Sequence, residues 1–319
     1  MTDPSSHLPA PEATPPLLAP QPRNTIFRGP NGLRAGWRVL LFVMIVAGLF
    51  LWLLVGVRFL LGKRSQLGGV SQLTPLGLGI SEATIFVLTS VSAWIMSRME
   101  GRKYGDYGLP IRLALRRNFW LGTLIGFGSI TICLFTIFLC RGFHISGMAL
   151  QGRLILTATL EWAAAFLAVG LAEEFTFRGY LQYTLTTGMG FWPAAVVLSA
   201  LFGLAHGRNP GETYFGLLSV VVFAILFCLF LRRTGNLWLA VGFHMGWDWG
   251  QTFFYGVRDS GIAPYHNLLN SEFSGPRWIT GGTVGPEASI FTPIVLVIVG
   301  IVFARVCREN RYEAVVSSR

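Results

Sequence analysis

Long apolar blocks recur along the chain and predict its secondary structure. Eight of them have the length and composition of helices that cross a bilayer, which requires about 20 mostly apolar residues. They are 37–61, 79–98, 119–140, 155–186, 191–207, 213–232, 236–255 and 289–306. The fourth block is too long for one perpendicular span, and the fifth is short. The pattern predicts an all-α, polytopic transmembrane helical bundle of about eight helices.

Two longer polar segments lie outside these blocks. Residues 1–30 are rich in Pro, Ser and Ala, and we expect them to form a disordered cytoplasmic tail. Residues 256–288 are polar and rich in Gly; they could cap the helices, but their turn residues favour an ordinary loop. We expect residues 31–319 to form one transmembrane domain.

The charge distribution favours a membrane protein. Only 13% of the residues are charged, against about 25% in soluble domains. The formal charge of +10 comes from short basic runs at the ends of apolar blocks, which indicates membrane topology and not nucleic-acid binding. With the N-terminus inside, 17 Lys and Arg residues lie on the inner side and 8 on the outer side. We therefore predict an integral protein of the cell membrane with both termini in the cytoplasm.

Ionisable residues inside apolar helices are the candidates for chemistry. Burying a charge in the bilayer costs at least about 2.5–3.5 kcal/mol, so such residues are functional by default. Three of the blocks, the fourth, fifth and seventh, carry them: Glu173, Glu174 and Arg178, then His206, then His244 and Asp248. Glu82 and Glu161 lie near the starts of their blocks, where interfacial water is available, and we expect them to be structural.

The two adjacent glutamates are predicted to differ. On a helix, Glu174 and Arg178 are four residues apart and share a face, so they can form an ion pair. Glu173 points about 100° away around the axis and stays free. A free carboxylate in an apolar setting suits a general base that works near neutral pH. Taken alone, a helix end anchored at the membrane interface explains the three residues equally well.

Helix geometry brings His206 to the level of Glu173. Both lie roughly 20 Å from the turn at residues 187–190, so an antiparallel helix pair places them at the same depth. His244 and Asp248 share a helix face, so the carboxylate can orient the imidazole or help to bind a cation. Because His244 lies only roughly 12 Å from the start of its block, its depth matches only if the helix tilts or has a longer polar entry. A purely structural His–Asp pair therefore competes more strongly here than a structural role does for Glu173 or His206.

Two mechanisms fit one glutamate and two histidines. Glu173, oriented by His206, could deprotonate a water molecule for attack on an amide while His244 stabilises the oxyanion. Alternatively, His206, His244 and a Glu could hold zinc and leave one position open for water. The ligands lack H-E-x-x-H spacing and come from separate helices, so the sequence does not show a metal.

In this order, the motifs resemble the CPBP family, which comprises the CAAX prenyl proteases and the bacteriocin-processing or immunity (Abi) proteins. The family pattern is E-E-x-x-x-R, then F-x-x-x-H, then H-x-x-x-N or D. Phe202 precedes His206 at the required spacing, and the match spans roughly residues 155–250. The resemblance implies a helical intramembrane endopeptidase in which Glu173 and His206 activate water. It also implies that His244 and position 248 line the oxyanion site.

This chain departs from the better understood prenyl-protein proteases at one position, where it has Asp248 instead of Asn. An ionised Asp cannot donate a hydrogen bond to an oxyanion. Asp248 must therefore be protonated, orient His244 or bind a metal.

The leading hypothesis is hydrolysis of a peptide bond in a membrane-associated peptide or protein. The alternative is a non-proteolytic membrane protein of the bacteriocin-immunity or partner-binding type, in which the polar cluster only fixes helix packing. A proton- or ion-coupled transporter would have inverted repeats and broken helices, and the sequence shows no convincing internal symmetry.

Overall fold

The computed structural model describes residues 25–29, 32–61 and 74–313. Most of the expected tail at 1–30, namely residues 1–24 and residue 30, lies outside the described residues. Strand β1 (Arg28–Gly29) pairs in antiparallel fashion with β2 (Gly32–Leu33) immediately before the first helix.

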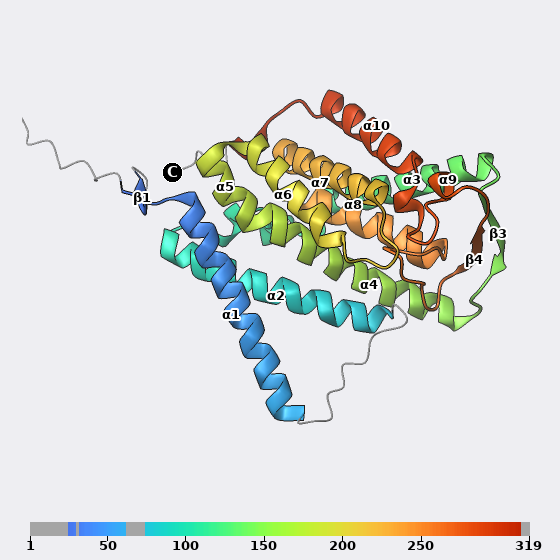
Figure 1. The fold of residues 1–319 in the computed structure, drawn as a ribbon, viewed down its shortest axis with the longest axis horizontal. Coiled ribbons are helices and arrows are strands. Elements are labelled where there is room, and N and C mark those ends of the chain that lie inside the picture. Colours follow the sequence, from blue (N-terminus) through green and yellow to red (C-terminus); the bar gives the residue numbers. More distant parts are fainter. Residues whose placement is uncertain (1–24, 30–31, 62–73, 314–319) are drawn as a thin grey trace, which may run out of the picture.

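The described chain is mostly helical, as predicted (Figure 1). The apolar blocks form these helices: α1 (Ala35–Leu61), α2 (Pro75–Glu100), α3 (Arg117–Leu139), α4 (Arg153–Phe175), α5 (Gln182–Met189), α6 (Phe191–His206), α7 (Tyr214–Thr234), α8 (Trp238–Asp248) and α10 (Phe291–Val306). Shorter elements are η2 (Tyr104–Tyr107), η3 (Ile111–Leu113), α9 (Arg277–Thr280) and η6 (Pro286–Ala288). Each of the eight predicted stretches thus contains at least one helix.

Among the described residues, five helical segments are long and apolar enough to cross a membrane: α1, α2, α3, the segment Arg153–Met189 and α7. α6 and α10 are shorter apolar helices. The chain is therefore an integral membrane protein. α1 contacts α2 and α5, and its C-terminal end leads away from the bundle (Figure 1).

The fourth predicted block is not one continuous α-helix. A π-helix, η4 (Thr176–Leu181), interrupts it directly after the two glutamates, and Gly179 there has non-helical angles of φ −81° and ψ −114°. A second π-helix, η5 (Trp249–Phe254), follows Asp248. Single π-turns inside helices frequently accompany functional sites. Here they follow the acidic residues of α4 and α8, two of the three helices that supply the predicted site.

Close packing of α3 against α8 fixes the helix that carries His244 and Asp248. A β-carbon added to Gly122 or Gly126 of α3 would overlap backbone atoms of α8. Gly242 and Gly246 of α8 approach the backbone of α3 in the same way. Small residues on both partners allow this backbone contact.

The segment 256–288 is more ordered than the ordinary loop that its turn residues suggested. It contains β4 (Leu269–Phe273), which pairs in antiparallel fashion with β3 (Phe143–Met148). Its beginning is held by the Gln251 side chain, which donates a hydrogen bond to the carbonyl oxygen of Arg258 (2.8 Å). The expectation of an ordinary loop was wrong because these long-range contacts are not encoded in local turn chemistry.

The two ends of the molecule differ in the elements they carry. β1, the start of α1 and the C-terminal end of the described chain lie at one end, whereas β3, β4 and α9 lie at the other (Figure 1). Arg233 at the end of α7 donates a hydrogen bond to the carbonyl oxygen of Arg308 (2.6 Å), which ties the C-terminal segment to the bundle.

Candidate active site

The residues predicted from the three motifs surround one cavity of about 260 Å³. Glu173 of α4, His206 of α6, and His244 and Asp248 of α8 line it directly. Glu174 and Arg178 lie behind this lining and are fully buried. The structure thus brings together all six residues from helices separated in the sequence.

Glu174 joins α4 to α8. Its Oε1 atom lies 3.4 Å from Nη1 of Arg178 and 3.0 Å from Nδ1 of His244. The guanidinium of Arg178 also stacks over the ring of Phe202, with Cζ 4.2 Å from the ring centroid. The predicted Glu174–Arg178 pair forms, and both side chains are completely buried inside the protein.

Glu173 faces the cavity, with 27% of its side chain exposed. Its Oε2 atom lies 3.6 Å from Nε2 of His244. Across the described residues, neither a hydrogen bond nor an ion pair links it to His206. The partner that orients Glu173 is therefore His244, and not His206 as expected.

His206 presents one free ring nitrogen to the same cavity. Its Nδ1 atom lies 2.8 Å from the carbonyl oxygen of Phe202, which can only accept a hydrogen bond, so Nδ1 carries the proton. In the neutral ring, Nε2 then holds the lone pair. The expected common depth of Glu173 and His206 agrees with their shared cavity.

His244 is surrounded by carboxylates. Besides the two glutamates, Asp248 places Oδ2 3.4 Å from its Nε2 atom. This arrangement is complementary to the positively charged imidazolium, in which both nitrogens donate. His244 therefore links α8 to α4 through its contacts with the two glutamates.

The expected mismatch in the depth of His244 was wrong. The count from the start of its block assumed that α8 begins at the membrane surface. Instead, Leu237 is completely buried, and its N–H donates a hydrogen bond to the carbonyl oxygen of Gly108 (2.8 Å). α8 begins inside the protein, so a short helical stretch suffices to reach the level of the glutamates.

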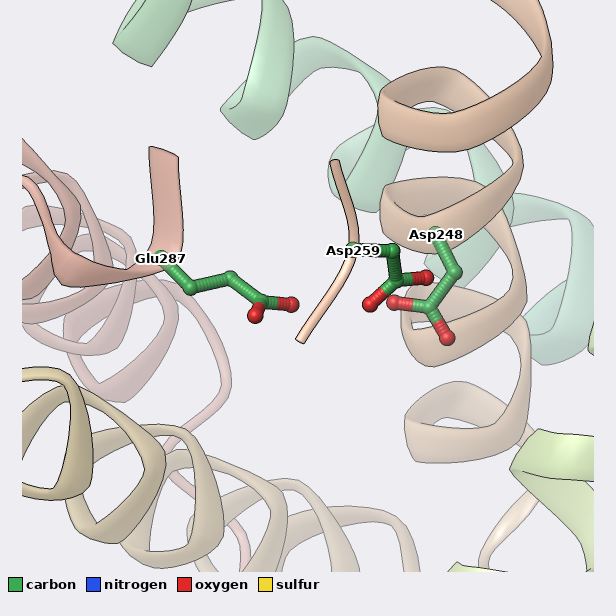
Figure 2. A group of neighbouring side chains, drawn as sticks. All are labelled: Asp248, Asp259 and Glu287. Atoms are coloured by element: carbon green, nitrogen blue, oxygen red, sulfur yellow. The ribbon is translucent and has the colours of Figure 1, made fainter. Parts of the chain in front are cut away.

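Two acidic residues of the site were missed by the sequence analysis. Asp259 and Glu287 approach Asp248, and one carboxylate oxygen from each of the three lies within 4.8 Å of the others (Figure 2). Thr252 donates a hydrogen bond to Asp259 (2.9 Å), and the N–H of Ser260 donates to Glu287 (3.1 Å). Both residues come from the segment 256–288, where only the Gly-rich run before Glu287 hinted at a special structure.

Burial and neighbouring charge act on these two loop carboxyls. Burial raises the pKa of Asp259, and the charge of Glu173 raises it further. Burial also raises the pKa of Glu287 well above its usual range, and the charges of Asp259 and Asp248 add to this effect. Like charges this close favour retention of a proton on at least one group.

Glu82 also lines the cavity, from α2. The expectation that Glu82 is only an interfacial structural residue does not fit this position, because the packing of α2 on α4 turns it toward Glu173. Glu161 is exposed on α4, outside the lining of the cavity.

The geometry does not fit zinc held by His206 and His244. Nε2 of His206 is open, as in a zinc-binding histidine, but neither His206 nor His244 belongs to a closely spaced group of three possible ligands among the described residues. Among the described residues, the closely spaced group of possible ligands is Asp248, Asp259 and Glu287. Its oxygen atoms suit hard cations and differ from the nitrogen and sulfur ligands that zinc prefers.

The segment that supplies the helical site residues matches a known family. Residues 155–250 match the family model for Type II CAAX prenyl endopeptidase Rce1-like, which describes a protease family. No curated protein matches the chain. The matched segment runs from α4 into η5 and contains both glutamates, both histidines and Asp248. Residues 155–250 of this chain therefore form an Rce1-like type II CAAX prenyl endopeptidase domain.

Proposed function

We propose that the protein is an intramembrane endopeptidase that hydrolyses a peptide bond of a membrane-associated peptide or protein. The observation that carries this proposal is the cavity shared by the Glu173 carboxylate and the free Nε2 side of His206. A base and a second proton acceptor that line the same cavity can hold and activate a water molecule between them.

The reaction follows from these positions. Glu173 takes a proton from water as the water oxygen bonds to the carbonyl carbon of the substrate, while His206 accepts the second hydrogen bond of that water. The tetrahedral intermediate collapses, the C–N bond breaks, and protonated Glu173 returns its proton to the leaving amine. Each of these steps uses only side chains of the cavity.

The buried residues support the base without contacting the substrate. Glu174 is neutralised by Arg178 and holds Nδ1 of His244, and the other ring nitrogen of His244 then faces Glu173. The separation of roles between the two glutamates supports one catalytic carboxylate and one structural carboxylate.

We further propose that residues 31–319 form a single domain in the cell membrane with both termini in the cytoplasm. The excess of Lys and Arg expected on the cytoplasmic side, 17 against 8, supports this orientation. The placement of β1 and the C-terminal segment at the same end of the molecule agrees with it (Figure 1).

The test compares purified wild type in detergent with Glu173→Gln and His206→Ala on a peptide library. We expect Glu173→Gln to lower kcat by about 10²–10⁴-fold, the usual contribution of a positioned base, while the variant unfolds at the wild-type temperature. Glu161→Gln, an exposed glutamate on the same helix, is the matched control and should cleave normally.

A folded wild type that cleaves no peptide, together with site variants that only melt earlier, would contradict the proposal. That result would favour the non-proteolytic alternative, in which the cluster serves helix packing for immunity or partner binding.

A further inference from the structure

Hydrolysis of an amide requires a hydrogen-bond donor for the oxyanion of the tetrahedral intermediate. The polar lining of the cavity is dominated by carboxylates: Glu82, Glu173, Asp248, Asp259 and Glu287. Ionised carboxylates only accept hydrogen bonds. A donor that does not depend on the protonation of these acids must therefore come from the few other polar groups of the lining.

Most of those groups already donate elsewhere. Nδ1–H of His206 donates to Phe202, and the indole N–H of Trp247 donates to Gln251 (2.8 Å). The hydroxyl of Ser260 donates to Glu287 (3.4 Å). Nδ1 of His244 is hydrogen-bonded to Glu174 (3.0 Å), and its Nε2 atom faces the carboxylates of Glu173 and Asp248 at ion-pair distance. Each of these four groups is therefore already engaged by a partner inside the protein.

Asn209 is the exception. It lines this cavity and also an adjoining cavity of about 260 Å³, which Glu173 and His206 line as well. Its backbone is held in the turn after α6, because its N–H donates to the carbonyl of His206 (2.9 Å) and its carbonyl accepts from Glu212 (3.2 Å). Over the described part of the chain, its side-chain amide forms no hydrogen bond. A neutral carboxamide has two N–H donors.

We propose that Asn209 is a catalytic residue that donates a hydrogen bond to the oxyanion; this inference rests on the proposed endopeptidase function. The turn after α6 places it three residues beyond His206, at the junction of the two cavities. Position 248, which holds Asn in the better understood prenyl-protein proteases, holds a carboxylate in this chain, so the amide reaches the reaction from a different element.

The test uses the peptide that wild type cleaves fastest and measures kcat and KM separately. Loss of one oxyanion donor lowers kcat by about 10²–10³-fold, so we expect a loss of this size for Asn209→Ala with little change in KM. The matched control is Asn270→Ala, an exposed position on β4, which should behave as wild type. Asp248→Asn combined with Asn209→Ala should restore part of kcat, because it returns an amide donor to the cavity.

A binding measurement provides a second readout. A phosphonamidate analogue of the same peptide mimics the tetrahedral intermediate, and wild type should bind it more tightly than the parent peptide. Asn209→Ala should reduce the affinity for the analogue by a factor similar to the fall in kcat and leave the affinity for the parent peptide unchanged.

The outcomes separate this inference from the proposed function. If Glu173→Gln abolishes cleavage while Asn209→Ala keeps wild-type kcat and wild-type affinity for the analogue, the role of Asn209 is overturned and the endopeptidase remains. If folded wild type cleaves nothing and does not prefer the analogue, both are overturned.

Discussion

Adjacent carboxylates in this protein have opposite surroundings. Glu173 faces a cavity and has one imidazole contact, whereas Glu174 is completely buried between Arg178 and His244. The same side-chain chemistry therefore serves two purposes one residue apart, because consecutive helix positions point about 100° apart.

This difference predicts opposite phenotypes for the two neutral variants. Glu174→Gln leaves Arg178 as a buried charge without its counter-ion, and breaking such a pair costs about 3–5 kcal/mol. Unfolding in denaturant, monitored in detergent, should show this loss for Glu174→Gln and almost none for Glu173→Gln. Equal stability of the two variants would refute the assigned roles.

The acidic trio makes stability depend on pH. Because burial raises the pKa of Glu287, the folded protein keeps a proton that the unfolded chain releases above the ordinary carboxyl value of 4.5. The contribution of Glu287 to stability is therefore fully present below that value and is lost as the pH rises through it toward the elevated pKa.

Glu287→Gln removes this loss. The melting temperature of the Glu287→Gln variant should exceed that of wild type at about pH 8. The difference should vanish at about pH 4, where the carboxyl of wild type is protonated in both the folded and the unfolded state. Melting curves across this range measure the effect, with exposed Glu272→Gln of β4 as the control. A variant that is less stable than wild type at high pH would contradict burial of the ionised carboxyl as the cause.

At the scale of elements, the contact between α3 and α8 sets the geometry of the site. Gly126→Ala would place a β-carbon onto the backbone of α8, and overpacking of this kind typically costs about 1–3 kcal/mol. We expect reduced stability together with reduced cleavage, because His244 moves with α8. Thermal unfolding and peptide cleavage in detergent test both effects.

Gly128 offers a control in the same helix. A β-carbon there meets no atom within 4 Å, so Gly128→Ala should leave stability and cleavage unchanged. If Gly128→Ala loses as much stability and cleavage as Gly126→Ala, the α3–α8 contact does not explain the result.

The helices of the site could be predicted from the sequence because their information is local. Long apolar blocks fix the spans, and the four-residue spacing of Glu174 and Arg178 fixes their pairing. The π-turns could not be predicted from the apolar blocks, since one extra residue per turn leaves the amino-acid composition of a block unchanged. The depth of His244 was misjudged because the buried start of α8 depends on contacts with the η3 region.

The loop residues of the site were beyond local patterns. Asp259, Glu287 and Asn209 join the cavity only after distant segments pack together. Glu82 reaches it through the packing of α2 against α4. Their residue types alone do not distinguish these side chains from ordinary solvent-exposed side chains.

At the scale of the whole molecule, a polar centre lies inside an apolar shell. Long apolar helices carry many exposed hydrophobic side chains, as lipid-facing surfaces do, while the carboxylates and imidazoles gather around one internal cavity. The membrane thus surrounds the apolar outer surface, and the protein encloses a polar cavity, in which we propose that hydrolysis occurs.

The buried start of α8 affects how the protein tolerates different membranes. Helices such as α1 and α2 adapt to bilayer thickness by tilting. α8 instead begins on a backbone hydrogen bond to Gly108 and is held by glycine contacts to α3. Contacts with neighbouring parts of the protein, and not with the lipid headgroups, therefore set the position of His244. A thicker or thinner bilayer would shift the outer helices, while the reacting groups keep their spacing.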